Sequence, residues 1–316
     1  PFNQRLMKQL SQHILMIRPA QFRMNEQTAV NNYFQTQASL PAQAVVEKAQ
    51  QEFDTYVSVL RSKGVLVTVI QDTEDPDTPD ALFPNNWVSF HTDGTVALYP
   101  MFAENRRLER REAILEILEE DGFLISEVMD YTAAENENIF LEGTGSLLLD
   151  RVNKKAYCAL SVRAHEDLFI EFCEDFDYAP VIFNAMQTVG DKLLPIYHTN
   201  VMMCLAETFA VICLDSIDDK KERKSVLAHL KENGKEVIAI SEAQMHAFAG
   251  NMLQVLGSND TPYLVMSTSA YQSLSSEQLS KIQVHCEIIH SDLNTIETAG
   301  GGSARCMMAE VFLPRV

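Results

Sequence analysis

The chain has 316 residues, 46% of them hydrophobic and 22% charged, and its 44 Asp and Glu against 25 Lys and Arg give a formal net charge of −19. This composition is typical of a globular protein, and the length allows two ordinary domains or one larger single-core fold. The acidic balance disfavours nucleic acid and anionic membranes as partners, because both bind basic surfaces.

The predicted elements form a repeating pattern. The first is an apolar strand, HILMIRP, followed by a polar loop, a helix over residues 41–63 and the strand VLVTVI. Four hairpins follow: WVSFHTDGTVALYP, SLLLDRVNKKAYCAL, VMMCLAETFAVICL and MLQVLGSNDTPYLVM. After each hairpin we expect a helix, over residues 104–121, 164–176, 219–233 and 271–283, and then a short strand, namely FLISEV, APVIF, EVIAI or CEIIH. The repeated unit is therefore β-β-α-β.

One polar residue precedes the inner strand of each unit at nearly even spacing: Asn86, Glu142, His198, Asn251 and Cys306 are separated by 56, 56, 53 and 55 residues. Such a period is close to those of propellers and solenoids. The strand after Cys306, CMMAEVFL, lacks a later partner, and pairing it with HILMIRP completes a fifth unit and closes a ring. We predict an α/β fold, a five-bladed ββαβ propeller with pseudo-fivefold repeats, formed by residues 1–316 as a single domain. The alternative is a pair of α/β domains with coincidental spacing.

Ring closure would bring a thiol, an imidazole and a carboxylate into one pocket. Cys306 is the candidate nucleophile, and its thiolate would be favoured by an imidazolium, by Arg305 or by a cationic substrate. His198 is the candidate general acid and base. Glu142 lies between apolar and small residues, and we expect its pKa to be raised so that it also carries protons. Each residue alone is compatible with a structural role, but their common register favours function.

The remaining cysteines are interpreted as core residues, since Cys158, Cys204 and Cys213 lie in apolar strands and Cys173 on a helix. None forms a CxxC pair, which favours a reducing, cytoplasmic location. We expect no signal peptide and no membrane span, because the start lacks a basic segment followed by an apolar one and the longest apolar stretch is short. We also expect no metal ion or other cofactor: VHCEIIH, although rich in possible ligands, is predicted to be a buried strand without a further ligand cluster.

Four motifs, FPNNW, LEGTGS, HTNV and GGGSARC, resemble in order and spacing those of the guanidino-group modifying enzymes, the amidinotransferase/arginine deiminase or pentein superfamily. The resemblance implies a five-bladed propeller with a central active site, in which Cys306 is the nucleophile, His198 the general acid/base and Glu142 the carboxylate that binds the substrate head. LSVRAH is similar to a Ser-x-Arg motif of this family, which implies that Arg163 binds a substrate α-carboxylate; a solvated arginine at a helix start is the other interpretation. The glycines before Cys306 imply a pliant loop that closes over a small amino-acid substrate.

The sequence departs from the arginine deiminase pattern where further aspartates are typical, since those positions hold Asn86 or Asn85, Gly145 or Ser146, and Asn200. An asparagine offers a donor and an acceptor and so matches a neutral ureido group, whereas a guanidinium offers only donors. We therefore expect hydrolysis of citrulline to ornithine, CO2 and ammonia, and the pattern resembles a citrulline-hydrolase-like subgroup. The alternatives are an arginine deiminase or dihydrolase, an amidinotransferase, and a non-catalytic binding protein of the same fold.

One polar segment has two interpretations. In MIRPAQFRMNEQTAVNNYF, Arg18 or Asn25 would line the mouth of the pocket, or the segment would be a surface loop with a helix, which we favour. The sequence does not specify the oligomeric state.

Overall fold

In the computed structural model, which describes residues 7–316, the strands form five three-stranded sheets and one separate hairpin. The middle strand of each sheet pairs antiparallel with one neighbour and parallel with the other. In spatial order the sheets are β17 (Ala309–Glu310), β1 (His13–Arg18) and β2 (Leu66–Gln71); β3 (Val88–Phe90), β4 (Thr95–Leu98) and β5 (Glu127–Asp130); β6 (Leu147–Asp150), β7 (Lys155–Ala159) and β8 (Ala179–Phe183); β11 (Met203–Leu205), β12 (Phe209–Ile212) and β13 (Glu236–Ala239); β14 (Leu253–Leu256), β15 (Pro262–Ser267) and β16 (Glu287–Ser291). The fold is α/β with mixed sheets that do not merge into one barrel.

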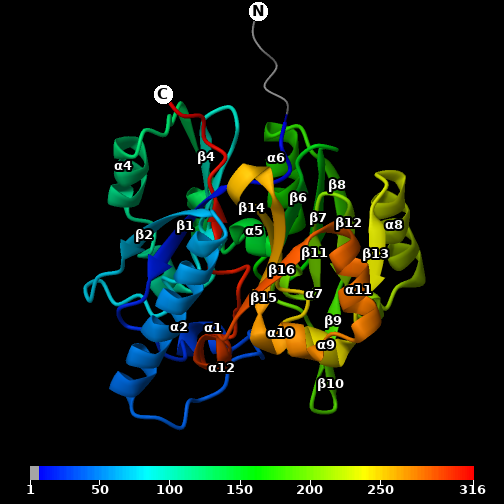
Figure 1. The fold of residues 1–316 in the computed structure, drawn as a ribbon, viewed down its shortest axis with the longest axis horizontal. Coiled ribbons are helices and arrows are strands. Elements are labelled where there is room, and N and C mark those ends of the chain that lie inside the picture. The colour runs from blue at the N-terminus through cyan, green and yellow to red at the C-terminus, as the bar shows by residue number, and fades with distance from the viewer. Residues whose placement is uncertain (1–6) are drawn as a thin grey trace, which may run out of the picture.

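Helices connect the parallel strands, and Figure 1 shows the longer ones at the periphery with the strands between them. These connecting helices are α1 (Glu26–Ala29), α2 (Ala42–Ser62), α3 (Glu104–Arg107), α4 (Glu112–Glu120), α6 (Glu166–Asp175), α8 (Lys220–Glu232), α10 (Thr268–Ser273) and α11 (Ser276–His285). Shorter elements join or flank the sheets: α5 (Gly143–Ser146), α7 (Thr199–Met202), α9 (Glu242–His246), α12 (Asn294–Gly300) and the 3-10 turns η1 (Pro84–Asn86), η2 (Thr132–Glu137), η3 (Leu214–Ser216) and η4 (Ser258–Asp260). No helix in the described part of the chain is long and apolar enough to cross a membrane.

The predicted pairing of the first and last strands is confirmed, since Leu15 of β1 lies opposite Ala309 of β17. The four predicted hairpins are also present. Two predicted helices are instead pairs of helices, and the second is divided because Leu274 is extended and Ser275 starts a new helix with a capping box. The strand expected at FLISEV begins only at Glu127, and His285 ends α11 instead of lying on a strand. The hairpin of β9 (Met186–Val189) and β10 (Lys192–Pro195) was not predicted.

Helix α2 illustrates how the sequence specifies packing. Its buried residues recur at helical spacing and form one face: Val45, Ala49, Phe53, Tyr56, Val57 and Leu60. Gly64 follows the helix at φ +84°, a conformation that favours glycine, and turns the chain into β2. Burial of each large side chain on this face contributes roughly 1.5–3 kcal/mol, so packing against the sheet, and not helix propensity alone, stabilises α2.

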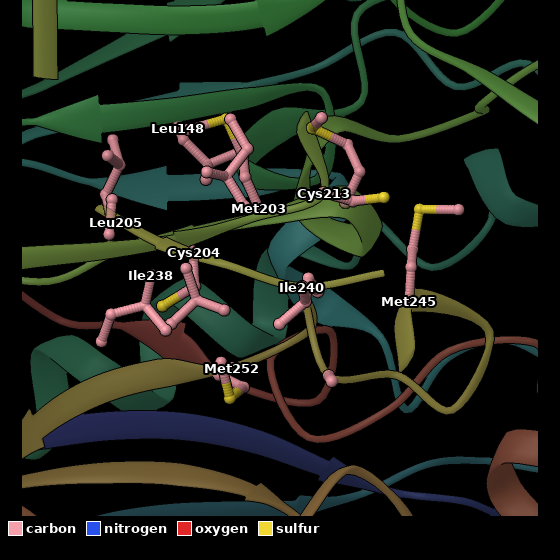
Figure 2. Packing of buried hydrophobic residues seen from close by; sticks show 14 of the residues in the cluster. Leu148, Met203, Cys204, Leu205, Cys213, Ile238, Ile240, Met245 and Met252 are labelled. Atoms are coloured by element: carbon pink, nitrogen blue, oxygen red, sulfur yellow. The ribbon is translucent and has the colours of Figure 1, made fainter. Parts of the chain in front are cut away.

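The sheets and helices enclose apolar cores in which cysteine acts as a small hydrophobic residue. Figure 2 shows Cys204 near Ile238 and Cys213 near Met245 within one apolar cluster that also includes Met203 and Met252. All six cysteines are free, and the four predicted to be core residues are buried among apolar neighbours. Their surroundings agree with a packing role.

The fold places each motif residue just before an inner strand. Asn86 belongs to η1 ahead of β3, Glu142 caps α5 ahead of β6, and His198 caps α7 ahead of β11. Asn251 and Cys306 precede β14 and β17 in the same way. Because α5 contacts both η1 and α7, the starts of neighbouring sheets converge.

Candidate active site

A carboxylate and an imidazole form the centre of the site. Nε2 of His198 lies 2.8 Å from Oε1 of Glu142, and both side chains are almost completely buried. The second oxygen, Oε2, accepts the backbone N–H of Phe102 at 2.9 Å. The backbone of Glu142 is held in turn, because its N–H donates to the Arg163 carbonyl at 3.1 Å and to Oγ of Ser146 at 2.9 Å. The carboxylate and imidazole are therefore fixed relative to each other.

The charges around this pair determine its protonation. Burial raises the pKa of Glu142, but the Arg163 guanidinium and the hydrogen bond from His198 outweigh it and hold the pKa below its usual value. The prediction of a raised pKa for Glu142 is therefore wrong. Burial lowers the pKa of His198, although the hydrogen bond to Glu142 opposes this. At neutral pH the site thus combines an ionised carboxylate with a neutral imidazole.

The ring nitrogen of His198 that faces away from the carboxylate is left for proton transfer. Since the carboxylate accepts, we assign the hydrogen to Nε2 and the lone pair to Nδ1. Within residues 7–316 the buried Nδ1 has no hydrogen-bond partner. A neutral imidazole in this tautomer is able to accept a proton from a nucleophile or from water.

Two asparagine side chains contact the sulfur of Cys306. Nδ2 of Asn251 lies 3.2 Å from Sγ and Nδ2 of Asn200 lies 3.5 Å from it. Arg305 does not support the thiol as expected, because its guanidinium donates to the Met308 carbonyl at 2.8 Å and to Glu310 at 3.1 Å. The neutral His198 supplies no imidazolium charge either. Amide donors are therefore the polar groups that contact the sulfur.

A small cavity brings most of the predicted residues together. Its lining includes Cys306, His198, Arg163 and Asn86. Glu142 lies behind His198 and Asn200 beside the sulfur, as their hydrogen bonds show. Asn85 lies in the layer behind, where its Oδ1 accepts from Nδ2 of Asn86 at 3.0 Å and its Nδ2 donates to Thr144 at 3.1 Å. The set of polar side chains suits the head and tail of a small amino acid.

Arg163 is buried, so the interpretation as a solvated arginine is wrong. Its Nε donates to Oδ1 of Asn31 at 2.8 Å, its Nη2 to the Thr28 carbonyl at 3.0 Å, and its Nη1 to Oε1 of Glu142 at 3.4 Å. The guanidinium also lies 4.9 Å from the ring centroid of Tyr197. In this state Arg163 joins the carboxylate of the central pair to the segment around α1.

That segment is a loop with the helix α1, as expected, but its inner side reaches the cavity, and neither Arg18 nor Asn25 is part of the cavity lining. Thr28 and Asn32 contribute to the lining. Asn25 is buried, caps α1 and donates to Oδ2 of Asp80 at 2.9 Å. Arg18 instead forms an ion pair with Asp54 at 2.8 Å on the outside of β1. Residues of the connection between β1 and β2 therefore form one wall of the cavity.

Two charged residues of the lining were not predicted. Arg106 is buried, donates to Oδ1 of Asn86 at 2.8 Å and pairs with both oxygens of Glu109 at 2.8 and 3.0 Å. Asp80 lies 4.0 Å from Nε of Arg106, and burial raises the pKa of Asp80 against the opposing charge of Arg106. In the sequence, RRLERR has the pattern of an exposed helix face, and nothing marks Arg106 as buried. The expectation that neutral groups replace the further carboxylates is thus wrong for the cavity as a whole, because Asp80 lines it.

Glycines permit close packing around the site. A Cβ at Gly145 would lie 2.5 Å from Nδ2 of Asn86 and 2.9 Å from Nδ1 of His198. A Cβ at Gly302 would lie 3.0 Å from the Phe83 ring, and Gly301 adopts φ +66°. The glycine run before Cys306 is therefore required by close approach and a left-handed turn.

No group of three or more His, Cys, Asp or Glu side chains in residues 7–316 is placed to hold a metal ion. His285, in the motif considered for metal binding, contacts Glu236 through Nε2 at 2.7 Å and Thr208 through Nδ1 at 2.7 Å. The described residues at the site are a thiol, a neutral imidazole and an ionised carboxylate.

Comparison with known proteins gives one family match. The model of the family described as N,N dimethylarginine dimethylhydrolase, eukaryotic, matches residues 18–313. No curated protein sequence matches the chain.

Solved structures share the fold. Apo ArgZ, an arginine dihydrolase from the ornithine-ammonia cycle in cyanobacteria, has a TM-score of 0.73 at 17% identity, over 96% of this chain and 41% of that one. A cysteine-to-alanine variant of AgrE with L-arginine has a TM-score of 0.73 at 18% identity, over 96% and 40%. A dimethylarginine dimethylaminohydrolase variant, as its adduct with S-methyl-L-thiocitrulline, has a TM-score of 0.63 at 16% identity, over 95% and 99%. The chain thus spans less than half the length of ArgZ and AgrE.

Proposed function

The chain belongs to the family described as N,N dimethylarginine dimethylhydrolase, eukaryotic, and from this we propose that it is a cysteine-dependent hydrolase of ureido or guanidino amino acids, with citrulline as the preferred substrate. The predicted membership of the guanidino-group modifying superfamily is confirmed, and with it an enzyme that acts on non-peptide C–N bonds. The observation that carries the proposal is the cavity that Cys306 and the His198–Glu142 pair share.

In the first proposed step, Cys306 gives its proton to Nδ1 of His198 and its sulfur attacks the ureido carbon. A C–S bond forms, the C–N bond to the terminal nitrogen breaks, and ammonia leaves with the proton from the imidazolium. Glu142, which accepts from Nε2 at 2.8 Å, stabilises the imidazolium while it exists. General acid–base catalysis of this kind contributes roughly 10²- to 10⁴-fold in rate.

In the second step, His198 removes a proton from water, which attacks the thio-linked carbonyl carbon. The C–S bond breaks, the proton returns to the sulfur of Cys306, and the released carbamate loses CO2 to leave ornithine. Citrulline and one water thus give ornithine, CO2 and ammonia, and the enzyme returns to its starting state. A covalent intermediate divides one difficult hydrolysis into two easier displacements.

The choice of citrulline rests on the amide groups near the sulfur. Asn200 contacts Sγ, and Asn86 lines the same cavity. An amide is able both to donate to a ureido oxygen and to accept from its N–H groups, so it pairs with each part of a neutral ligand. A buried guanidinium would need anionic partners at this end of the cavity.

Arginine is the second candidate, and a specific observation favours it. Asp80 adds a carboxylate to the lining, and the polar contacts of Cys306 include no cation, so a cationic substrate would support the thiolate. With arginine the same residues would act as a deiminase, releasing one ammonia and citrulline, or as a dihydrolase, releasing two. The arginine dihydrolase and dimethylarginine enzymes of the same fold agree with this alternative.

The test is a substrate screen with the full chain. Citrulline, arginine, dimethylarginine and agmatine are each incubated with the enzyme, and ammonia, citrulline and ornithine are quantified. We expect equal amounts of ornithine and ammonia from citrulline, and none with Cys306→Ala. Turnover of arginine with inert citrulline would reject the preferred substrate, and amidino transfer to an added amine would identify an amidinotransferase.

The same proposal includes the finer architecture. We propose that the five sheets are the blades of a five-bladed propeller, that residues 1–316 form one catalytic domain, and that Asn86, Asn200 and Arg163 bind the substrate. Asn85, which was also expected to bind it, would instead orient Asn86 from behind. Support comes from the shared strand order of the sheets and from the pairing of β1 with β17. Limited proteolysis of the free and substrate-bound enzyme tests the single domain, since two domains would release a stable fragment. The six free cysteines favour a cytoplasmic location.

A further inference from the structure

Asn251 contacts the sulfur through an amide whose orientation is fixed. The side chain is fully buried before β14. Its Oδ1 accepts the backbone N–H of Arg305 at 3.1 Å, and its Nδ2 lies 2.9 Å from the Asn200 carbonyl and 3.2 Å from Sγ of Cys306. If the amide were rotated by 180°, its NH2 group would face the Arg305 N–H, which is also a donor. Its oxygen would face the Asn200 carbonyl, which is also an acceptor. The N–H group must therefore face the sulfur.

A donor in this position stabilises negative charge on sulfur. A hydrogen bond to an ionised group is stronger than one to a neutral group, so the contact favours the thiolate over the thiol. Asn200 presents Nδ2 at 3.5 Å and Oδ1 at 3.8 Å from Sγ, so its amide has no comparable fixed direction. The guanidinium of Arg305 is paired with Glu310. Asn251 is thus the donor to Sγ whose direction is fixed.

We propose that Asn251 is a further catalytic residue, which donates a hydrogen bond to the Cys306 sulfur, holds it in one direction and stabilises the thiolate before attack. This rests on the proposed function, in which Cys306 is the nucleophile. The competing explanation is structural: Asn251 joins the backbone before Cys306 to that of Asn200, and its loss would loosen both segments. The two explanations differ in what happens to the reactivity of the thiol in a folded variant.

The experiment measures alkylation of Cys306 by iodoacetamide in the substrate-free enzyme from pH 5 to 9, with mass spectrometry to locate the label. Asn251→Asp keeps the acceptor for the Arg305 N–H but replaces the donor by an anionic oxygen, and Asn251→Ala removes both. The matched control is Gln254→Ala on β14, which removes the Oε1 that accepts from the Glu207 N–H at 2.8 Å and no contact to Sγ. Cys306→Ala gives the background.

We expect both Asn251 variants to be alkylated about tenfold more slowly at pH 7, with the pH profile displaced upward by about one unit, because a hydrogen bond to an ionised group is lost. Gln254→Ala should lower Tm without changing the profile. Unchanged profiles in both Asn251 variants, with a Tm loss like that of the control, would overturn the proposal, as would wild-type alkylation no faster than background. If the wild type hydrolyses no ureido or guanidino amino acid yet the alkylation difference persists, the proposed function fails and the role of Asn251 in thiolate stabilisation stands.

Discussion

The imidazole of His198 and the carboxylate of Glu142 lie 2.8 Å apart, and both are shielded from solvent. Such a pair differs from a surface ion pair, because desolvation disfavours the imidazolium more than the carboxylate attracts it. Its resting state is therefore a neutral base beside an anion. The imidazolium forms only when His198 takes a proton from the nucleophile, and at that step the Glu142 carboxylate stabilises the new positive charge.

The first prediction concerns pH. Because burial lowers the pKa of His198 from its usual 6.5 to about 4, kcat/KM should stay near its maximum as the pH falls through 6.5 and decline only as the pH approaches about 4. Glu142→Gln removes the carboxylate that favours the protonated imidazole, so the decline of kcat/KM at acid pH should begin at a lower pH in this variant than in the wild type. The variant's kcat should fall roughly 100-fold, because the imidazolium is no longer stabilised. Steady-state rates from pH 3 to 9 check both. A wild-type decline that begins at pH 6.5 or above would show that the imidazole is not desolvated.

The second prediction uses the glycine that packs against the pair. In Gly145→Ala, the new Cβ would lie 2.5 Å from Nδ2 of Asn86 and 2.9 Å from Nδ1 of His198. Relief of this overlap should cost about 1–3 kcal/mol of stability and displace the imidazole, so we expect at least a tenfold loss in kcat.

The control for this prediction is Gly190→Ala in the turn between β9 and β10. A Cβ there meets no atom within 4 Å, but φ is +63°, so the variant should lose about 1 kcal/mol through backbone strain while kcat is retained. Thermal unfolding and steady-state assays measure the two effects separately. Equal activity in both variants would show that the imidazole tolerates displacement.

Local periodicity explains how much of the fold was predictable. Short segments of the sequence specify the hairpins, the alternating strands and the polar residue before each inner strand. The even spacing of these features also implied the pairing of β1 with β17. The hairpin around Gly190 carries a turn signal too, but it is an insertion between repeats, so the repeat pattern did not include it. The end of α10 depends on the cap at Ser275, which a helical periodicity does not reveal.

The site was predictable only where register determines it. The spacing brought Glu142, His198 and Cys306 together, but the burial of Arg106 depends on its contacts with Asn86 and the Phe83 carbonyl, which are tertiary. The direction of the Glu142 pKa was missed for a similar reason, since the charge of Arg163 reverses the effect of burial. Partners that come from other repeats or from the wall of the cavity between β1 and β2 leave no local signal.

The third prediction concerns substrate choice. Asn86→Asp adds a negative charge to the lining with little change in shape, and it keeps the oxygen that accepts from Nη1 of Arg106 at 2.8 Å. Its second oxygen replaces the Nδ2 that donates to Oδ1 of Asn85 at 3.0 Å, so one hydrogen bond is lost. If an amide selects the ureido group, the ratio of kcat/KM for arginine to that for citrulline should rise at least tenfold, about 1.4 kcal/mol in differential binding. Paired steady-state assays give this ratio. A ratio that stays constant would remove Asn86 from the determinants of specificity.

The fourth prediction concerns Glu297 on α12, three residues before the glycine run. Burial raises its pKa from 4.5 to about 8, against hydrogen bonds from Ser267, Ser269 and Ser303 and with a further rise from the charge of Glu52. At neutral pH the Glu297 carboxyl is therefore protonated in the folded protein and ionised in the unfolded chain. The resulting stability is fully present below pH 4.5, the unfolded value, and is lost as the pH rises through about 8.

The glutamine in Glu297→Gln has nearly the same shape as a protonated glutamate but does not titrate. The free energy of unfolding of this variant should therefore not fall with rising pH for this reason. Between pH 6 and 9 we expect the wild type to lose on the order of a few kcal/mol relative to the variant, since each pKa unit corresponds to about 1.4 kcal/mol. Urea unfolding at several pH values measures the difference, and Glu287→Gln at an exposed position of β16 serves as the control. Parallel losses in the wild type and Glu297→Gln would mean that the carboxylate is already ionised in the folded protein, and that the serines around it stabilise the anion well enough to overcome its burial.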